Sequence, residues 1–234
     1  MNEIWVIVFL ATFLGVGIGG ILSYVFNGFK KSRGTIYAVC TGLIIGLISF
    51  EIAPVALALG NWIMLAFGFL MGVLLFKVVH SVLTRYLHKH SHLKSGLILA
   101  LIISIHNFPI GVMLGASEQL TINNVLLQTM ILHTIPEGMI LFTLLFLARF
   151  RFLPVVLLSF LLAVPVALGA IFGEMIGMEN SIVWAFLLSL TVGTIYMVTI
   201  KEILPEAVKY SSNRSSLLVA VVTFFLLGAY LFYI

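Results

Sequence analysis

The chain has 234 residues, of which 62% are hydrophobic and only 9% are charged. So few charged side chains cannot cover the surface of a soluble protein of this length, which excludes a soluble enzyme or binding domain. The net charge of +4 does not indicate a nucleic-acid partner, because the basic residues are scattered in short clusters between apolar runs. We therefore predict an integral membrane protein.

Uncharged apolar runs of about 20 residues are what a helix needs to cross the hydrocarbon layer. In chain order, such runs predict eight transmembrane helices, at residues 4–26, 35–59, 61–79, 96–116, 124–148, 153–177, 182–208 and 215–234. The first run lacks a basic leader and a cleavage pattern, so we expect a retained span rather than a signal peptide. Continuous apolar runs favour an all-α polytopic membrane protein, with one transmembrane domain, over a β-barrel.

The basic residues outside the spans predict how the chain is oriented. They follow the first, third, fifth and seventh spans: Lys30, Lys31, Arg33, Arg85, Lys89, Lys94, Arg149, Arg151, Lys209 and Arg214. The opposite connections carry Glu118 and Glu179 instead. The positive-inside rule then places both termini outside the cytoplasm. Compact loops and a short N-terminus favour a bacterial plasma membrane.

The fourth and fifth spans contain related motifs, HNFPIG at residues 106–111 and HTIPEG at residues 133–138. His133 and Glu137 are four residues apart and share a helix face, so one ion could contact both. His106 could supply a third ligand, with Asn107 nearby. Neutral imidazole and carboxylate suit Zn²⁺, Fe²⁺ and similar divalent cations better than Na⁺ or K⁺.

Each of these motifs has a proline three residues after the histidine. Proline cannot donate a backbone hydrogen bond, so each motif frees a carbonyl one turn earlier, at Ile105 and Leu132, and we expect this backbone to face protein or a water-filled cavity. A second pair of related sequences lies in the second and seventh spans: EIAPVA at residues 51–56 and EILPEA at residues 202–207. These two spans run in opposite directions, as the inverted repeats of secondary transporters do.

Five of the eight glutamates fall inside predicted spans. Besides Glu137, we expect Glu51 and Glu174 towards the outer ends of their spans, and Glu202 and Glu206 towards the inner end of the seventh. These four carboxylates could line a cation pathway, or they could be interfacial groups that simply reach water.

Residues 80–95 are expected to form a cytoplasmic loop rich in histidine and basic residues. His88, His90 and His92 alternate there and could bind a divalent metal weakly, although a basic loop held by anionic lipid is an equal alternative. The single cysteine, Cys40, lies in an apolar run, which excludes an intrachain disulfide and a cysteine-based zinc site.

Taken together, the spans, the histidine-bearing loop and the three motifs resemble the ZIP family of divalent metal transporters over nearly the whole chain. The resemblance implies a 3+2+3 inverted-repeat bundle that forms a homodimer. Spans one, four, five and six would carry the metal in an elevator motion against spans two, three, seven and eight. His106, Asn107, His133 and Glu137 match metal-binding positions of the family motifs, and Glu202 matches an acidic position on the cytoplasmic release side.

Three positions depart from the family pattern. Ile110 stands where the family usually has a glutamate that bridges two metals, and Thr134 occupies a position that is often acidic or Asn. Val164 replaces the glutamate of a Glu-Pro pair in the sixth span. We therefore expect one metal position, built from His106, His133 and Glu137, with the second site weakened or absent.

The leading hypothesis is uptake of a divalent transition metal into the cytoplasm by a transporter that is not an enzyme. Zn²⁺ is the expected ion, with Fe²⁺, Mn²⁺ and Cd²⁺ as alternatives. An intramembrane zinc metallohydrolase is a second hypothesis, because His133 and Glu137 could hold Zn²⁺ and activate water, but the chain has no HExxH motif. A metal sensor that binds without transport is the third.

Overall fold

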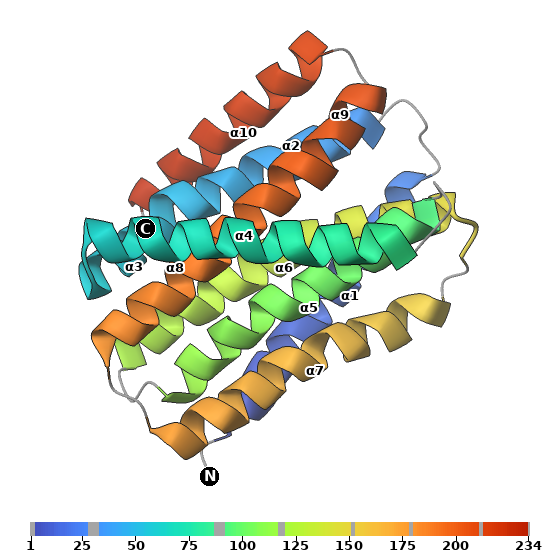
Figure 1. The fold of residues 1–234 in the computed structure, drawn as a ribbon. Coiled ribbons are helices and arrows are strands. Elements are labelled where there is room, and N and C mark those ends of the chain that lie inside the picture. The colour runs from blue at the N-terminus through green and yellow to red at the C-terminus, as the bar shows by residue number, and fades with distance from the viewer. Residues whose placement is uncertain are drawn as a thin grey trace.

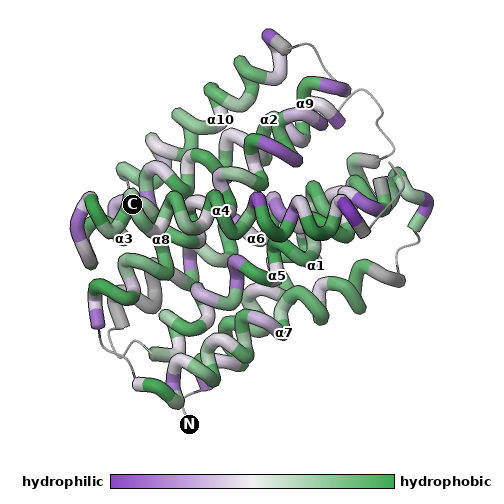
Figure 2. Tube along the Cα trace, in the orientation of Figure 1, coloured by the Kyte–Doolittle hydropathy of each residue, from purple (hydrophilic) through white to green (hydrophobic). Residues whose placement is uncertain are grey.

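The computed structural model describes residues 3–27, 33–86, 92–116, 120–150, 153–177, 180–210 and 213–233. These ranges contain no strand, and their helices form eight stretches that are long and apolar enough to cross a membrane. Figure 1 shows an inclined helical bundle with both termini at the same end. In Figure 2, hydrophobic residues dominate the helices, and hydrophilic residues lie at many helix ends and at a few positions in the middle of the bundle. The predicted all-α polytopic fold is confirmed.

Six of the eight stretches are single helices, and two are composite. The single helices are α1 (Ile4–Asn27), α4 (Trp62–Tyr86), α5 (His92–Ala116), α6 (Leu120–Leu147), α7 (Leu153–Ile176) and α10 (Asn213–Tyr233). The composite stretches are α2 (Arg33–Leu47), η2 (Ile48–Ile52) and α3 (Ala53–Leu59), and α8 (Ser181–Val198), η3 (Thr199–Ile203) and α9 (Leu204–Tyr210). Asn180 caps α8, because its side-chain oxygen accepts from the backbone N–H groups of Ile182 and Val183.

The segment expected as a loop at residues 80–95 is mostly helical. Helix α4 continues through His80 and Arg85 to Tyr86, rather than ending at residue 79, and α5 already begins at His92. Hydropathy marks where a chain leaves hydrocarbon, whereas backbone hydrogen bonding can continue for several turns into the polar region. His88 and His90 lie outside the described residues, so the predicted loop metal site is untested.

The irregular turns lie in spans two and seven, not at the histidine motifs. Helices α5 and α6 run without interruption through Pro109 and Pro136, because a proline removes only one backbone hydrogen bond. In the composite stretches, by contrast, the π-helical turns η2 and η3 each come shortly before a proline, Pro54 and Pro205. Each proline still leaves a carbonyl one turn earlier, at Ile105 in α5 and Leu132 in α6, without its usual backbone donor.

Close glycine contacts pair the helices in a pattern that repeats between the two halves of the chain. Helix α1 packs on α6, and the corresponding pair in the second half is α7 on α5. Similarly, α2 packs on α10, and the corresponding pair is α8 on α4. In each pair, a Cβ added to a glycine would meet the facing backbone: Gly19 meets Ile135, Gly173 meets Val112, Gly42 meets Ala220, and Gly72 meets Leu190. This arrangement agrees with a 3+2+3 inverted repeat.

These contacts divide the bundle into two groups of helices. We call α1, α5, α6 and α7 the site bundle, and α2, η2, α3, α4, α8, η3, α9 and α10 the frame. The backbone contacts that glycines allow lie within one group or the other. Between the groups, α5 meets α8 and α2 meets α6 over smaller areas.

A side chain at Gly19 should destabilise the site bundle. Its Cβ would meet the carbonyl of Ile135 and lie 2.7 Å from the backbone nitrogen of Met139, so α1 and α6 would have to separate. We expect Gly19→Val to lower the unfolding temperature in detergent by about 5–10 °C. Gly17→Ala is the matched control, because its Cβ would lie 3.8 Å from Ser159 Oγ, an ordinary contact. Equal unfolding temperatures for the two variants would contradict this packing.

Candidate metal site

His106, His133 and Glu137 come together in the interior of the site bundle. Their side chains are almost completely buried, with at most 3% exposed. His106 Nε2 lies 3.0 Å from Glu137 Oε1, and the two imidazole ring centroids are 6.5 Å apart. One ligand atom of each residue lies within 4.8 Å of the others, close enough for all three to surround one ion.

The local sequence explains this meeting. His106 lies near the middle of α5, and His133 lies near the middle of α6. Because α5 and α6 pack against each other, their midpoints meet inside the bundle. Glu137 follows His133 by one helical turn, which carries its carboxylate to the same face of α6.

The site contains polar atoms that form no hydrogen bond with any residue in the described part of the chain. Glu137 Oε2 and His106 Nδ1 are buried without a hydrogen-bond partner among the described residues. The side-chain amide of Asn107, which is 0% exposed, likewise has neither its oxygen nor its nitrogen paired. Buried polar atoms are nearly always paired, so the unpaired atoms of His106 and Glu137 within this cluster are suited to an additional ligand.

The positions that depart from the family pattern leave this site with a single carboxylate among the described residues. Ile110 is buried one turn after His106, on α5, and offers no ligand atom. Thr134 is also buried, and its hydroxyl donates to the backbone oxygen of Ile131 at 3.2 Å. Val164 likewise contributes only an apolar side chain on α7.

Thr191 of α8 links the site to the frame. Its hydroxyl lies 3.5 Å from the backbone oxygen of His106 and 3.0 Å from that of Leu187. Sequence reasoning missed this residue, because nothing distinguishes it from other threonines in apolar runs. The contact joins the two groups of helices beside His106.

The outlying carboxylates are placed on other elements and do not join the cluster. Glu51 lies in η2 and Glu202 at the corresponding position of η3, whereas Glu174 lies near the end of α7. Glu206 lies in α9 and pairs with Lys209 at 3.3 Å. All four glutamates are half-buried.

His80 acquires a partner that the sequence did not predict. Its Nε2 lies 3.1 Å from Glu202 Oε1, so the end of α4 is joined to η3 within the frame. The two residues are far apart in the sequence, and only the packing of α4 on α8 brings them together.

Comparison with known proteins identifies the fold and its class of substrate. A family model described as ZIP Zinc transporter matches residues 80–234, which include the motifs at residues 106–111, 133–138 and 202–207. A search of curated proteins finds no match. Members of the ZIP family are transporters of zinc and other divalent metals rather than enzymes. Since the match covers more than half of the chain, this integral membrane protein belongs to the ZIP family of divalent metal transporters.

Proposed function

We propose that the protein carries Zn²⁺ across the membrane into the cytoplasm, with His106, His133 and Glu137 as its ligands. The observation that carries this proposal is the meeting of the three buried side chains at the middle of α5 and α6. Imidazole nitrogen and carboxylate oxygen are common ligands of zinc. Fe²⁺, Mn²⁺ and Cd²⁺ remain alternatives, because they accept related ligand sets.

The ligand set suits an ion that must leave again. Three protein ligands leave a zinc ion with an open position, in contrast to the closed sites that hold structural zinc. Asn107 could add a neutral oxygen, because its amide has no other partner among the described residues. A single carboxylate compensates only part of the charge of a divalent ion, which favours fast release over tight retention.

An elevator motion of the site bundle against the frame would give this buried site access to each side in turn. The tight glycine contacts lie inside each group, which supports movement of each group as a rigid body. The contact of Thr191 with the His106 carbonyl would have to break during this motion. We infer the orientation from the basic residues outside the predicted spans, and those of them that the structure describes lie at or next to helix ends: Arg33, Arg85, Lys94, Arg149, Lys209 and Arg214.

The remaining glutamates would form the approaches to the site. We assign Glu51 and Glu174 to the outer side, and Glu202 and Glu206 to the cytoplasmic side, where His80 contacts Glu202. As in the family resemblance, the transporter would be a homodimer, and we place it in a bacterial plasma membrane. We also propose that His88, His90 and His92 bind the divalent metal weakly.

Zinc binding should release protons and weaken at low pH. A metal ion bound to His106 Nε2 and Glu137 Oε1, now 3.0 Å apart, would take the place of the hydrogen bond between them, and any protonated histidine would have to lose its extra proton. Histidine must be neutral to bind metal, so we expect zinc affinity to fall at least about tenfold between about pH 7.5 and about pH 5.5. Calorimetry in buffers of different ionisation enthalpy measures the released protons. Binding that is independent of pH would contradict histidine ligation.

A flux assay in proteoliposomes tests the proposed ion. Radioactive zinc uptake is measured with excess unlabelled Zn²⁺, Fe²⁺, Mn²⁺, Cd²⁺ or Ca²⁺ as competitor. We expect Zn²⁺ to compete most strongly and Ca²⁺ to have no effect, because calcium prefers ligand sets made only of oxygen. Zinc binding without uptake would instead support a sensor, and peptide or lipid hydrolysis that chelators abolish would support a metallohydrolase.

A further inference from the structure

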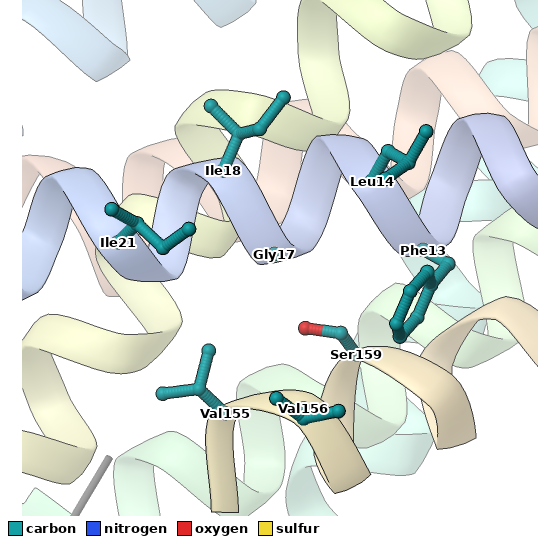
Figure 3. A pocket seen from close by; sticks show the side chains of 8 residues that line it. All are labelled: Phe13, Leu14, Gly17, Ile18, Ile21, Val155, Val156 and Ser159. Carbon is teal, nitrogen blue, oxygen red and sulfur yellow. The ribbon is translucent and has the colours of Figure 1, made fainter. Parts of the chain in front are cut away.

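A narrow groove separates α1 from α7 on the surface of the site bundle. It encloses about 180 Å³ between residues 13–21 of α1 and residues 155–159 of α7. Figure 3 shows Gly17 on one wall and Ser159 on the other. Since Gly17 has no side chain, nothing from α1 fills this space, and even an added Cβ would remain 3.8 Å from Ser159 Oγ.

Ser159 contributes the only polar side chain among the residues that line the groove. It is 0% exposed, and its hydroxyl has no hydrogen-bond partner among the described residues. Other buried hydroxyls in the bundle donate to the backbone oxygen four residues earlier, as Thr12 of α1, Thr41 of α2 and Ser189 of α8 do. The Ser159 oxygen instead points across the gap towards α1 (Figure 3). A buried donor without an acceptor is unfavourable, so the groove is suited to a ligand that brings an acceptor.

The surroundings of the groove limit what that ligand can be. Leu14, Ile18, Ile21 and Val156 line it, and each is between 44% and 55% exposed. In a membrane-spanning bundle, such apolar side chains face lipid rather than water. The cavity is slightly larger than the roughly 150 Å³ cavity that holds one benzene molecule, so it accepts a short segment of hydrocarbon.

The depth of Ser159 in the membrane favours contact with the ester carbonyl of a phospholipid. Ser159 is six residues beyond Leu153, the start of α7, which corresponds to about 9 Å along the helix axis. If α7, with its 24 residues and length of about 36 Å, is centred in about 30 Å of hydrocarbon, Ser159 lies about 6 Å inside the nearer boundary. Ester carbonyls of phospholipids lie near that boundary, joined directly to an acyl chain.

We propose that this groove binds one acyl chain of a membrane phospholipid, whose ester carbonyl accepts a hydrogen bond from Ser159. Both walls belong to the site bundle, so the bound lipid would move with the metal site rather than with the frame. The proposal depends on the membrane embedding of the chain, but not on metal binding.

Photolabelling in nanodiscs tests the proposal. The bilayer is phosphatidylcholine with a small fraction of phosphatidylcholine that carries a diazirine on one acyl chain. After irradiation, mass spectrometry compares labelling of residues 13–21 and 155–159 with labelling of residues 217–226 on the exposed face of α10. We expect the groove to be labelled about fivefold more strongly than α10, because a hydrogen bond and an enclosed contact both retain the lipid.

Substitutions at Gly17 and Ser159, together with a competing lipid, test the cavity and the hydrogen bond separately. Gly17→Leu should fill the groove and reduce its labelling to the level of α10, whereas Gly17→Ala should retain most of it. Ser159→Ala keeps the cavity but removes the donor, and should reduce labelling about threefold. Unlabelled ester-linked lipid should compete for the groove more strongly than an ether-linked lipid with the same chains, because the ether lacks the carbonyl.

Three results would overturn the proposal. Equal labelling of the groove and α10 in the wild type would indicate ordinary contact with bulk lipid. Labelling that is unchanged by Ser159→Ala and by the ether linkage would refute the hydrogen bond to the carbonyl. Crosslinking between two copies through Ile18→Cys, with no lipid labelling, would show that a second chain covers this face.

Discussion

Replacing Glu137 with Gln is expected to weaken zinc binding at least about 100-fold, because it removes the only carboxylate of the buried cluster. An amide of nearly the same shape keeps the packing of α5 and α6 but cannot balance the charge of a divalent ion. The other two ligands would then have to hold the ion in an interior where the described residues of the cluster offer no compensating charge. Isothermal titration calorimetry of the purified protein measures the change in the dissociation constant.

Ser189→Ala is the matched control for this substitution. Ser189 is 0% exposed and donates to the Ala185 backbone oxygen of its own helix, so it tests the effect of removing a buried polar group away from the cluster. We expect its zinc affinity to equal that of the wild type. If Glu137→Gln bound zinc as tightly as this control, Glu137 would not be a ligand.

Introducing a carboxylate at Ile110 is expected to produce the second largest change. Ile110 follows His106 by one helical turn, as Glu137 follows His133, and it is only 4% exposed. In Ile110→Glu, the added carboxylate would lie beside the existing ligands and improve the charge balance around a divalent ion. We expect zinc to bind about 10–100-fold more tightly and to leave more slowly, so that both the KM and the maximum rate of transport fall.

Ile110→Leu keeps the apolar character and the volume of this position, so it separates the effect of charge from that of packing. We expect its KM and maximum rate to match those of the wild type. Concentration-dependent zinc uptake by proteoliposomes provides both values for each variant. If Ile110→Glu changed neither affinity nor selectivity among metals, the account of a missing second carboxylate would be wrong.

Much of the architecture follows from hydropathy, because a membrane requires long apolar helices and leaves little choice of secondary structure. The eight spans are found close to their predicted positions. The end of the third span was misplaced because the chain remains helical from His80 to Tyr86 after its composition becomes polar. Composition describes the solvent around a helix, whereas backbone hydrogen bonds determine its ends.

The approach of His106 to His133 and Glu137 could also be predicted. The four-residue spacing in α6 fixes one face of that helix, and the similar position of both motifs within their spans places them at the same depth. Both helices continue through Pro109 and Pro136, because the loss of one hydrogen bond can be tolerated when neighbouring helices support the backbone.

Features that depend on the packing of distant segments could not be predicted. The pairing of His80 with Glu202 and the contact of Thr191 with His106 both join residues from separate helices. The orientation of the Ser159 hydroxyl towards Gly17 likewise depends on how α7 lies against α1. No local spacing in the sequence encodes any of these three contacts.

The central claim is that zinc crosses the membrane through the site formed by His106, His133 and Glu137. The most direct measurement is radioactive zinc uptake into proteoliposomes that contain the wild type, His133→Ala or Ser189→Ala at equal amounts of folded protein. The account predicts uptake by the wild type and Ser189→Ala, and a rate at least about 100-fold lower for His133→Ala. Undiminished uptake by His133→Ala would contradict it.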